Sequence, residues 1–310
     1  MGHENVQMSR DSGSEPAGLP VFGGVDGCRG GWFVAWTVAG GEGGAAAENA
    51  GGTDGAVTPE GVRWRTGLFP HFALLVQAVL NGSPPETLRL LVDMPIGLPS
   101  GSAPRRCDVD ARRLLGPGRG SSVFPAPPRA VLEAGSWEEG LSLARASSGR
   151  GISLQAWHLV PKIREVDDLL RAERCWVGRI REAHPELLFR GLAMGGARAE
   201  GEPPPDLPPK RTREGFEARL GLLEAASPGI GAVVEGALGT HPRRVLARDD
   251  ILDALVAAVV ARLEGEVGLQ AVPDLAERDE EGLPMEIVIG VRGASSGERG
   301  CGSGQRGAEW

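Results

Sequence analysis

Apolar and polar positions in the first seventy residues alternate as they do in short β-strands. Residues 21–26 are a short apolar run that ends at an aspartate, and from Trp32 to Val38 the side chains alternate with a period of two. From Val62 to Leu68 mainly apolar residues alternate with arginines, which would lie on the opposite face of a strand. These patterns predict three strands, the third with one wet face.

A helix and a buried strand are predicted next. Between Phe72 and Leu80 the apolar side chains fall at helical spacing. Residues 88–92 form a continuous apolar run that ends at Asp93 and is stopped by Pro95, as expected of a strand covered on both faces. The first half therefore predicts an α/β fold with three strands, a helix and a buried strand.

The second half has a more helical pattern. Residues 98–178 carry three helix-forming stretches between Pro and Gly breaks, which predicts a mainly helical insertion. Residues 184–192 predict another strand, and residues 212–226 an amphipathic helix. The clearest apolar stripe belongs to a helix that begins at Asp249, and residues 286–290 predict a final edge strand.

Low-complexity segments mark the limits of the predicted domain. Residues 1–19 are polar with Pro and Gly breaks, and residues 293–310 are rich in Gly and Ser, so both predict disordered tails. Residues 40–58 predict a long flexible loop. One domain is therefore expected over residues 20–292.

Composition narrows the class of protein. With 310 residues, 41% of them hydrophobic, the chain can bury a sizeable core. No apolar run approaches the roughly 18 residues of a membrane span, and the N-terminus has no apolar segment typical of a secretory signal. The four cysteines are scattered without CxxC spacing, which favours the reducing cytoplasm over a disulfide framework or a zinc cluster.

Overall charge argues against unaided attraction to nucleic acid. The formal net charge is −8, so a nucleic-acid partner would need a local basic patch or a site filled with metal.

Two aspartates, Asp26 and Asp93, each follow an apolar strand at its end. If the strands before Asp26 and Asp93 are neighbours and parallel, both carboxylates project from the carboxyl end of the sheet. They would repel each other unless one is protonated or a cation lies between them. Mg²⁺ or Mn²⁺, which prefer oxygen ligands, would suit that position. Each aspartate taken alone is also a common turn residue.

Further acids lie in the second half. Asp250 and Asp253 are three residues apart on the last helix and share a face. Capping of the helix explains Asp249 and Asp250, but it explains Asp253, beside the apolar stripe, less well. Glu186 could be another ligand and His184 a proton shuttle, although a solvated glutamate and a structural histidine are the ordinary interpretations.

This order of strands and acids is the pattern of the RNase H-like superfamily. Short motifs over roughly residues 21–265 resemble an uncharacterised bacterial and archaeal family of predicted nucleases with an RNase H-like fold. The motifs are GVDGCRGGW (24–32), DMPIGLP (93–99), CDVDAR (107–112), SSVF (121–124), SLQ (153–155), PKIREVD (161–167), HPE (184–186) and DDILDA (249–254).

The resemblance implies a mixed sheet flanked by helices, and a site at its end. Asp26 and Asp93 would be the core metal ligands, and Asp250 and Asp253 would complete the site. The residues that the resemblance places around the cleft are Arg29, Ser121, Ser122, Gln155, Lys162, Asp167 and Glu186. In the superfamily's usual chemistry one metal ion activates a water and a second stabilises the leaving oxygen of a phosphodiester. Arg29 and Lys162 would suit contacts with phosphate.

Two other functions fit parts of the pattern. The turn after Asp26 also resembles the first phosphate loop of actin-like sugar kinases, which would make the chain a nucleotide-binding phosphotransferase. Those proteins need a duplicated half, and the sequence shows no second copy. A non-catalytic binding module could keep the same fold and use its helical insertion to hold a partner.

Overall fold

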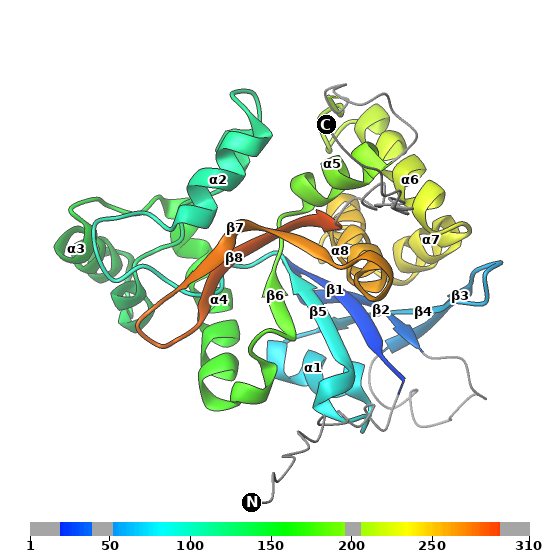
Figure 1. Cartoon of the computed structure of the whole chain (residues 1–310), viewed down its shortest axis with the longest axis horizontal. Coiled ribbons are helices and arrows are strands. Elements are labelled where there is room, and N and C mark those ends of the chain that lie inside the picture. The colour runs from blue at the N-terminus through cyan, green and yellow to red at the C-terminus, as the bar shows by residue number, and fades with distance from the viewer. Residues whose placement is uncertain (1–18, 39–51, 196–205, 292–310) are drawn as a thin grey trace, which may run out of the picture.

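Six strands of one mixed sheet form the centre of the part of the chain that is described. The computed structural model describes residues 19–38, 52–195 and 206–291. The strand order is β3-β4-β2-β1-β5-β6 (Figure 1). The strands are β1 (Val21–Cys28), β2 (Gly31–Val38), β3 (Gly52–Val57), β4 (Arg63–Phe69), β5 (Leu88–Val92) and β6 (Ile180–Glu182).

Helices surround this sheet, and a separate hairpin follows the last of them. In Figure 1, α2 and α3 are drawn to the left of the sheet, and α6 and α7 to the right. α2 packs on α5 and the later hairpin rather than on the sheet. The helices are α1 (Phe72–Leu80), α2 (Arg106–Leu115), α3 (Trp137–Ser148), α4 (Leu154–Ala172), α5 (Pro185–Gly195), α6 (Arg213–Ala226), α7 (Ile230–Thr240) and α8 (Arg248–Val267). The antiparallel pair β7 (Leu269–Arg278) and β8 (Pro284–Val291) forms a second sheet.

The strands beside Asp26 and Asp93 are adjacent and parallel, as predicted, although β1 continues past Asp26 to Cys28. The β1–β5 register runs from Val21 opposite Leu88 to Val25 opposite Val92. β1 pairs antiparallel with β2, so the sheet is mixed. Since Asp26 and Asp93 each follow the last pair of that register, they emerge at the same edge of the sheet.

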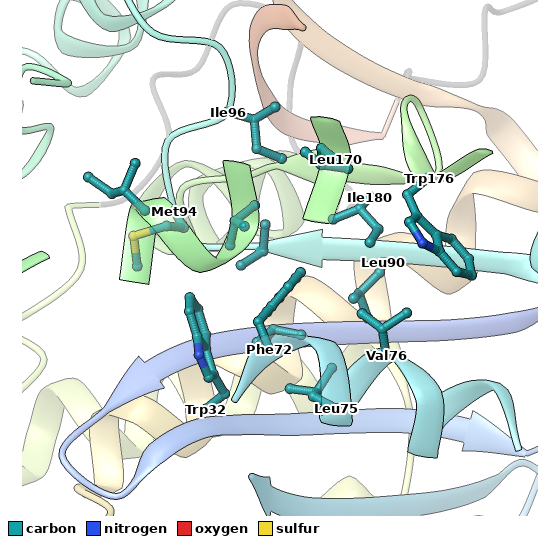
Figure 2. Close-up of a cluster of buried hydrophobic side chains, with 14 of the residues drawn as sticks. Trp32, Phe72, Leu75, Val76, Leu90, Met94, Ile96, Leu170, Trp176 and Ile180 are labelled. Carbon is teal, nitrogen blue, oxygen red and sulfur yellow. The ribbon is translucent and has the colours of Figure 1, made fainter. Parts of the chain in front are cut away.

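Both faces of the sheet are buried, which explains why β2 is apolar at nearly every position. Trp32, Val34 and Trp36 enter one core with α1 and α4 (Figure 2), where Trp32 packs on Phe72 with ring centroids 4.9 Å apart. Phe33 and Ala35 enter the opposite core with α8. The alternation of a strand thus separates two hydrophobic cores rather than a wet face from a dry one.

Some of the predicted elements were wrong. Residues 184–192 belong mostly to α5 rather than to a strand, because Pro185 is a favourable first helical residue and its apolar residues serve a helix as well as a strand. Within the predicted loop 40–58, residues 52–57 form β3, which pairs with β4 at the sheet edge. The rest of that loop up to residue 51, and the predicted tails except Leu19, lie outside the described residues.

The end of the chain differs from the prediction in its pairing. β8 is a strand, but it pairs with β7, which was not predicted. It meets the region of β6 through a bridge between Ala183 and Val288 and through the Arg181–Glu286 ion pair. The helical prediction for residues 98–178 is confirmed by α2, α3 and α4. Among the described residues, no helix is long and apolar enough to cross a lipid bilayer.

Candidate functional site

Four carboxyl groups from three segments gather at the edge of the sheet where β1 and β5 end. Asp26 is 8% exposed and Asp253, on α8, is 2% exposed. Burial raises the pKa of Asp26 well above its ordinary value, and the charges of the other acids, Asp253 first, raise it further. The other two acids that act on Asp26 are Asp93 and Asp250.

A glycine on β1 allows α8 to reach this edge. A Cβ atom on Gly24 would lie 2.1 Å from the Ala254 carbonyl oxygen and 2.2 Å from the Ala258 nitrogen, so only glycine fits between the strand and the helix. Gly24 and Asp26 share a face of β1 because they are two residues apart. The same close packing that excludes a side chain at Gly24 therefore brings Asp253 next to Asp26.

The carboxyl groups resist ionisation. Burial raises the pKa of Asp93 to about 6, although Lys210 lowers it. Burial also raises the pKa of Asp253 to about 7 against the lowering effect of Lys210. The pKa of Asp250 is raised by burial, while its hydrogen bond from the Ala247 backbone lowers it. The positive charges nearby therefore do not fully compensate the negative charge that these carboxyl groups would carry when ionised.

Lys210, just before α6, is a cation in direct contact with the cluster. Its Nζ atom donates to Asp253 Oδ2 over 2.6 Å and lies 3.9 Å from Asp249 Oδ2. Burial lowers the pKa of Lys210, but Asp253 and the other acids outweigh this and hold the pKa above its ordinary value. The ammonium group is therefore charged and serves as an internal counter-ion. No local motif in the sequence indicated this residue.

The donor set fits a divalent cation in its chemistry. Asp253 Oδ1 is buried and has no hydrogen-bond partner among the described residues. Carboxylate oxygens are the ligands that Mg²⁺ and Mn²⁺ prefer. As they are placed, however, no three His, Cys, Asp or Glu side chains in the described ranges are grouped to hold a metal ion. These side chains therefore suit a divalent cation in the type and the charge of their ligand atoms. In the structure, Lys210 is the counter-ion.

Asp250 also caps its helix. Its Oδ2 atom accepts a hydrogen bond from the Ala247 backbone over 2.9 Å. This arrangement satisfies a free amide at the start of α8 and places negative charge at the positive end of the helix dipole. Asp250 therefore combines the capping role with a position in the cluster, whereas Asp253, one turn further, has no such structural use.

Glu186, at the start of α5, is near the cluster but is bound by arginines. Both of its carboxylate oxygens accept from Arg219 Nη2, over 2.7 and 2.9 Å, and Oε2 also lies 3.2 Å from Arg119 Nη1. Its charge still raises the pKa values of Asp93 and Asp253. With its oxygens engaged, Glu186 anchors α5 to α6 at the rim of the site.

His184 and Ser122 lie on the same rim. His184 Nε2 is 3.5 Å from Ser122 Oγ, and the Ser122 hydroxyl donates to the Arg119 carbonyl oxygen over 2.8 Å. Burial lowers the pKa of His184, which favours the neutral form of its imidazole. Its Nδ1 atom is buried and has no partner within the described ranges.

The two predicted phosphate contacts lie at the turn between β1 and β2. Lys162 Nζ donates to the Gly31 carbonyl oxygen over 2.6 Å and lies 4.6 Å from the Trp32 ring centroid. Its side chain passes beside Gly27, where a Cβ atom would be 2.7 Å from Lys162 Cδ. Arg29 is exposed at the tip of the turn. Arg29 thus follows Asp26 closely along the chain, and Lys162 reaches the same turn from α4.

Three of the residues expected around the cleft have other surroundings. Ser121 lines a separate surface pocket with Arg112 and Arg113. Gln155 is exposed in the first turn of α4. Asp167 binds Arg129 through two hydrogen bonds of 2.8 and 2.9 Å, in a cluster with the turn between β7 and β8. For Asp167 this contact indicates a structural role.

Comparison with known proteins gives a family but no activity. The model of a family described as "Protein of unknown function (DUF429)" matches residues 24–278. No curated protein and no solved structure matches the chain.

Proposed function

This chain belongs to the DUF429 family, whose function is unknown, and we propose that its acidic cluster is the active site of a nuclease that depends on Mg²⁺ or Mn²⁺. The observation that carries the proposal is the buried carboxylate of Asp253 beside the buried Asp26. One oxygen of Asp253 has no hydrogen-bond partner among the residues that the structure describes. The resemblance of the sequence motifs to predicted nucleases with an RNase H-like fold supports the same function.

The energetics of the cluster favour a cation site over a scaffold. Burying a carboxylate that lacks full pairing destabilises the folded protein. Three such groups on adjacent elements, with pKa values raised by burial, would be replaced by apolar residues if stability alone mattered. A bound divalent cation supplies the missing positive charge, and then the ionised form of each carboxylate is the favourable one.

In this proposal each part of the site has a separate task. Asp26, Asp93, Asp250 and Asp253 would hold the metal, which would supply Lewis-acid chemistry to a phosphodiester. Lys210, which binds Asp253 in the structure, would donate to a phosphate oxygen when Asp253 is a metal ligand. The neutral His184 imidazole at the rim is able to accept a proton.

The test is a cleavage assay with a panel of phosphodiesters. Labelled single-stranded, double-stranded and branched DNA, RNA, and bis(p-nitrophenyl) phosphate are incubated with Mg²⁺, with Mn²⁺ or with EDTA. We expect hydrolysis with metal only, and a loss on the order of 10²-fold or more in Asp26→Asn and Asp93→Asn. Asp168→Asn, at an exposed carboxyl on α4, is the matched control and should keep full activity.

Two results would contradict the proposal. Hydrolysis that survives Asp26→Asn would place the activity elsewhere. An absence of hydrolysis across the whole panel, with nucleic acid still bound, would favour a binding module. Consumption of a nucleoside triphosphate, measured in parallel, would instead favour the phosphotransferase.

A further inference from the structure

A cavity of about 530 Å³ opens beside the acidic cluster. It is lined by Gly27, Cys28, Arg29, Arg211, Arg243, Val245, Ala247, Asp249 and Asp250. Gly27 is the neighbour of Asp26, and Asp250 belongs to the cluster itself. The cavity and the cluster are therefore continuous along the edge of the sheet, and the cavity has the size of typical small-ligand sites.

Three arginines from separate segments line this cavity. Arg29 comes from the turn between β1 and β2, Arg211 from the segment before α6, and Arg243 from the connection between α7 and α8. A backbone hydrogen bond of 2.9 Å from Gly30 to the Val245 carbonyl oxygen fixes two of these segments to each other. In a chain with a net charge of −8, this gathering provides the local basic site that an anionic ligand needs.

The acids in the lining are already engaged. Asp250 accepts from the Ala247 backbone over 2.9 Å. Asp249 lies 3.9 Å from Lys210 Nζ and 4.0 Å from Arg211 Nε. For Arg29 and Arg243, in contrast, the described residues offer no ion pair, so their guanidinium groups are available to a ligand. The first residues of α8 border the same cavity and add the positive end of a 20-residue helix.

We propose that this cavity binds an internal phosphate of the nucleic-acid strand, beside the phosphodiester that the acidic cluster hydrolyses. This inference rests on the proposed nuclease function, and it adds a binding step to it. Arg243 and Arg29 contact the phosphate oxygens through charge-assisted hydrogen bonds. The site thereby sets the register of the strand relative to Asp26 and Asp253.

Arg243 and its sequence neighbour allow a matched test. Both arginines are exposed, but Arg243 lines the cavity and Arg244 lies outside the lining. Binding of labelled oligonucleotides is measured by fluorescence anisotropy, with Ca²⁺ in place of Mg²⁺, at several salt concentrations. Arg243→Gln should weaken binding roughly tenfold and reduce the slope of log K against log salt by about one. Arg244→Gln should change neither quantity.

Oligonucleotides with and without a 5′ phosphate distinguish the two sources of the phosphate. If Arg243→Gln weakens both equally, the cavity takes an internal phosphate of the strand. If only the phosphorylated oligonucleotide loses affinity, the cavity takes a terminal phosphate, and the proposed internal position is wrong.

The outcomes separate this inference from the proposed function. Equal effects of Arg243→Gln and Arg244→Gln, or no binding by the unaltered protein, would overturn the phosphate site. Binding that depends on Arg243 without any hydrolysis would sustain the phosphate site and contradict the nuclease. Hydrolysis with a KM that Arg243→Gln leaves unchanged would sustain the nuclease and contradict the phosphate site.

Discussion

Burial disfavours the charged form of three carboxyl groups in the site, those of Asp26, Asp93 and Asp253. The three differ in whether a local sequence pattern could predict their burial. Asp26 and Asp93 end apolar strands, and this local signal predicted them. The burial of Asp253 depends on how closely α8 packs on β1, which no local pattern states. Lys210 has no sequence signal, because its role arises from a contact with Asp253, 43 positions away.

The raised pKa of Asp93 leads to a prediction of how the stability of the metal-free protein depends on pH. Burial raises its pKa from 3.8 to about 6, so the folded state holds the proton more tightly than the unfolded state. Its contribution to stability is present below about pH 4 and is lost as pH rises through about 6. Asparagine has no proton to lose, so Asp93→Asn removes this loss. As the pH rises from 4 to 7.5, the free energy of unfolding of the variant should increase relative to that of the unaltered protein by up to about 3 kcal/mol.

Urea unfolding in EDTA at the two pH values measures this gain. Asp168→Asn serves as the control, because its exposed carboxyl should show no comparable gain. The explanation fails if the two variants depend on pH in the same way.

The contact between β1 and α8 is the interface that builds the site, since it joins Asp26 to Asp253. Apart from β3, the order of strands and helices up to β5 was predictable because each of these elements has its own period of apolar residues. α5 was taken for a strand because a short apolar run fits either structure. β3 was missed because its glycines and polar residues form a strand only when β4 is present to pair with them.

Gly24→Ala tests this interface. The added methyl group would meet the backbone of α8 at about 2 Å, so the helix must move away from the sheet. We expect a loss of about 3 kcal/mol or more in the free energy of unfolding. Gly221→Ala on α6 is the control, because nothing lies within 4 Å of its added Cβ atom, and alanine should stabilise the helix by about 0.5–1 kcal/mol. Equal stability of the two variants, measured by urea unfolding, would contradict the close packing of α8 on β1.

At the scale of the whole molecule, the site draws on residues that lie far apart in the sequence. The acids come from β1, from the segment after β5 and from α8, while the cations come from the β1–β2 turn and from segments beside α6 and α8. Strand ends and helix periodicity predicted the acidic side. The arginines of the cavity were predictable only in part, because Arg211 and Arg243 lie in connecting segments whose course the sequence pattern does not determine.

The central claim is that the carboxyl groups form a site for a divalent cation, with Lys210 as the internal competitor. Calorimetric titration of Mn²⁺ at pH 7.5 into the unaltered protein, Asp253→Asn and Lys210→Met tests it most directly. We predict saturable binding that weakens at least tenfold in Asp253→Asn, because a ligand and its charge are lost, and tightens in Lys210→Met, because the competing ammonium is gone. Mn²⁺ binding that is absent, or that is the same in the unaltered protein and Asp253→Asn, would contradict the claim.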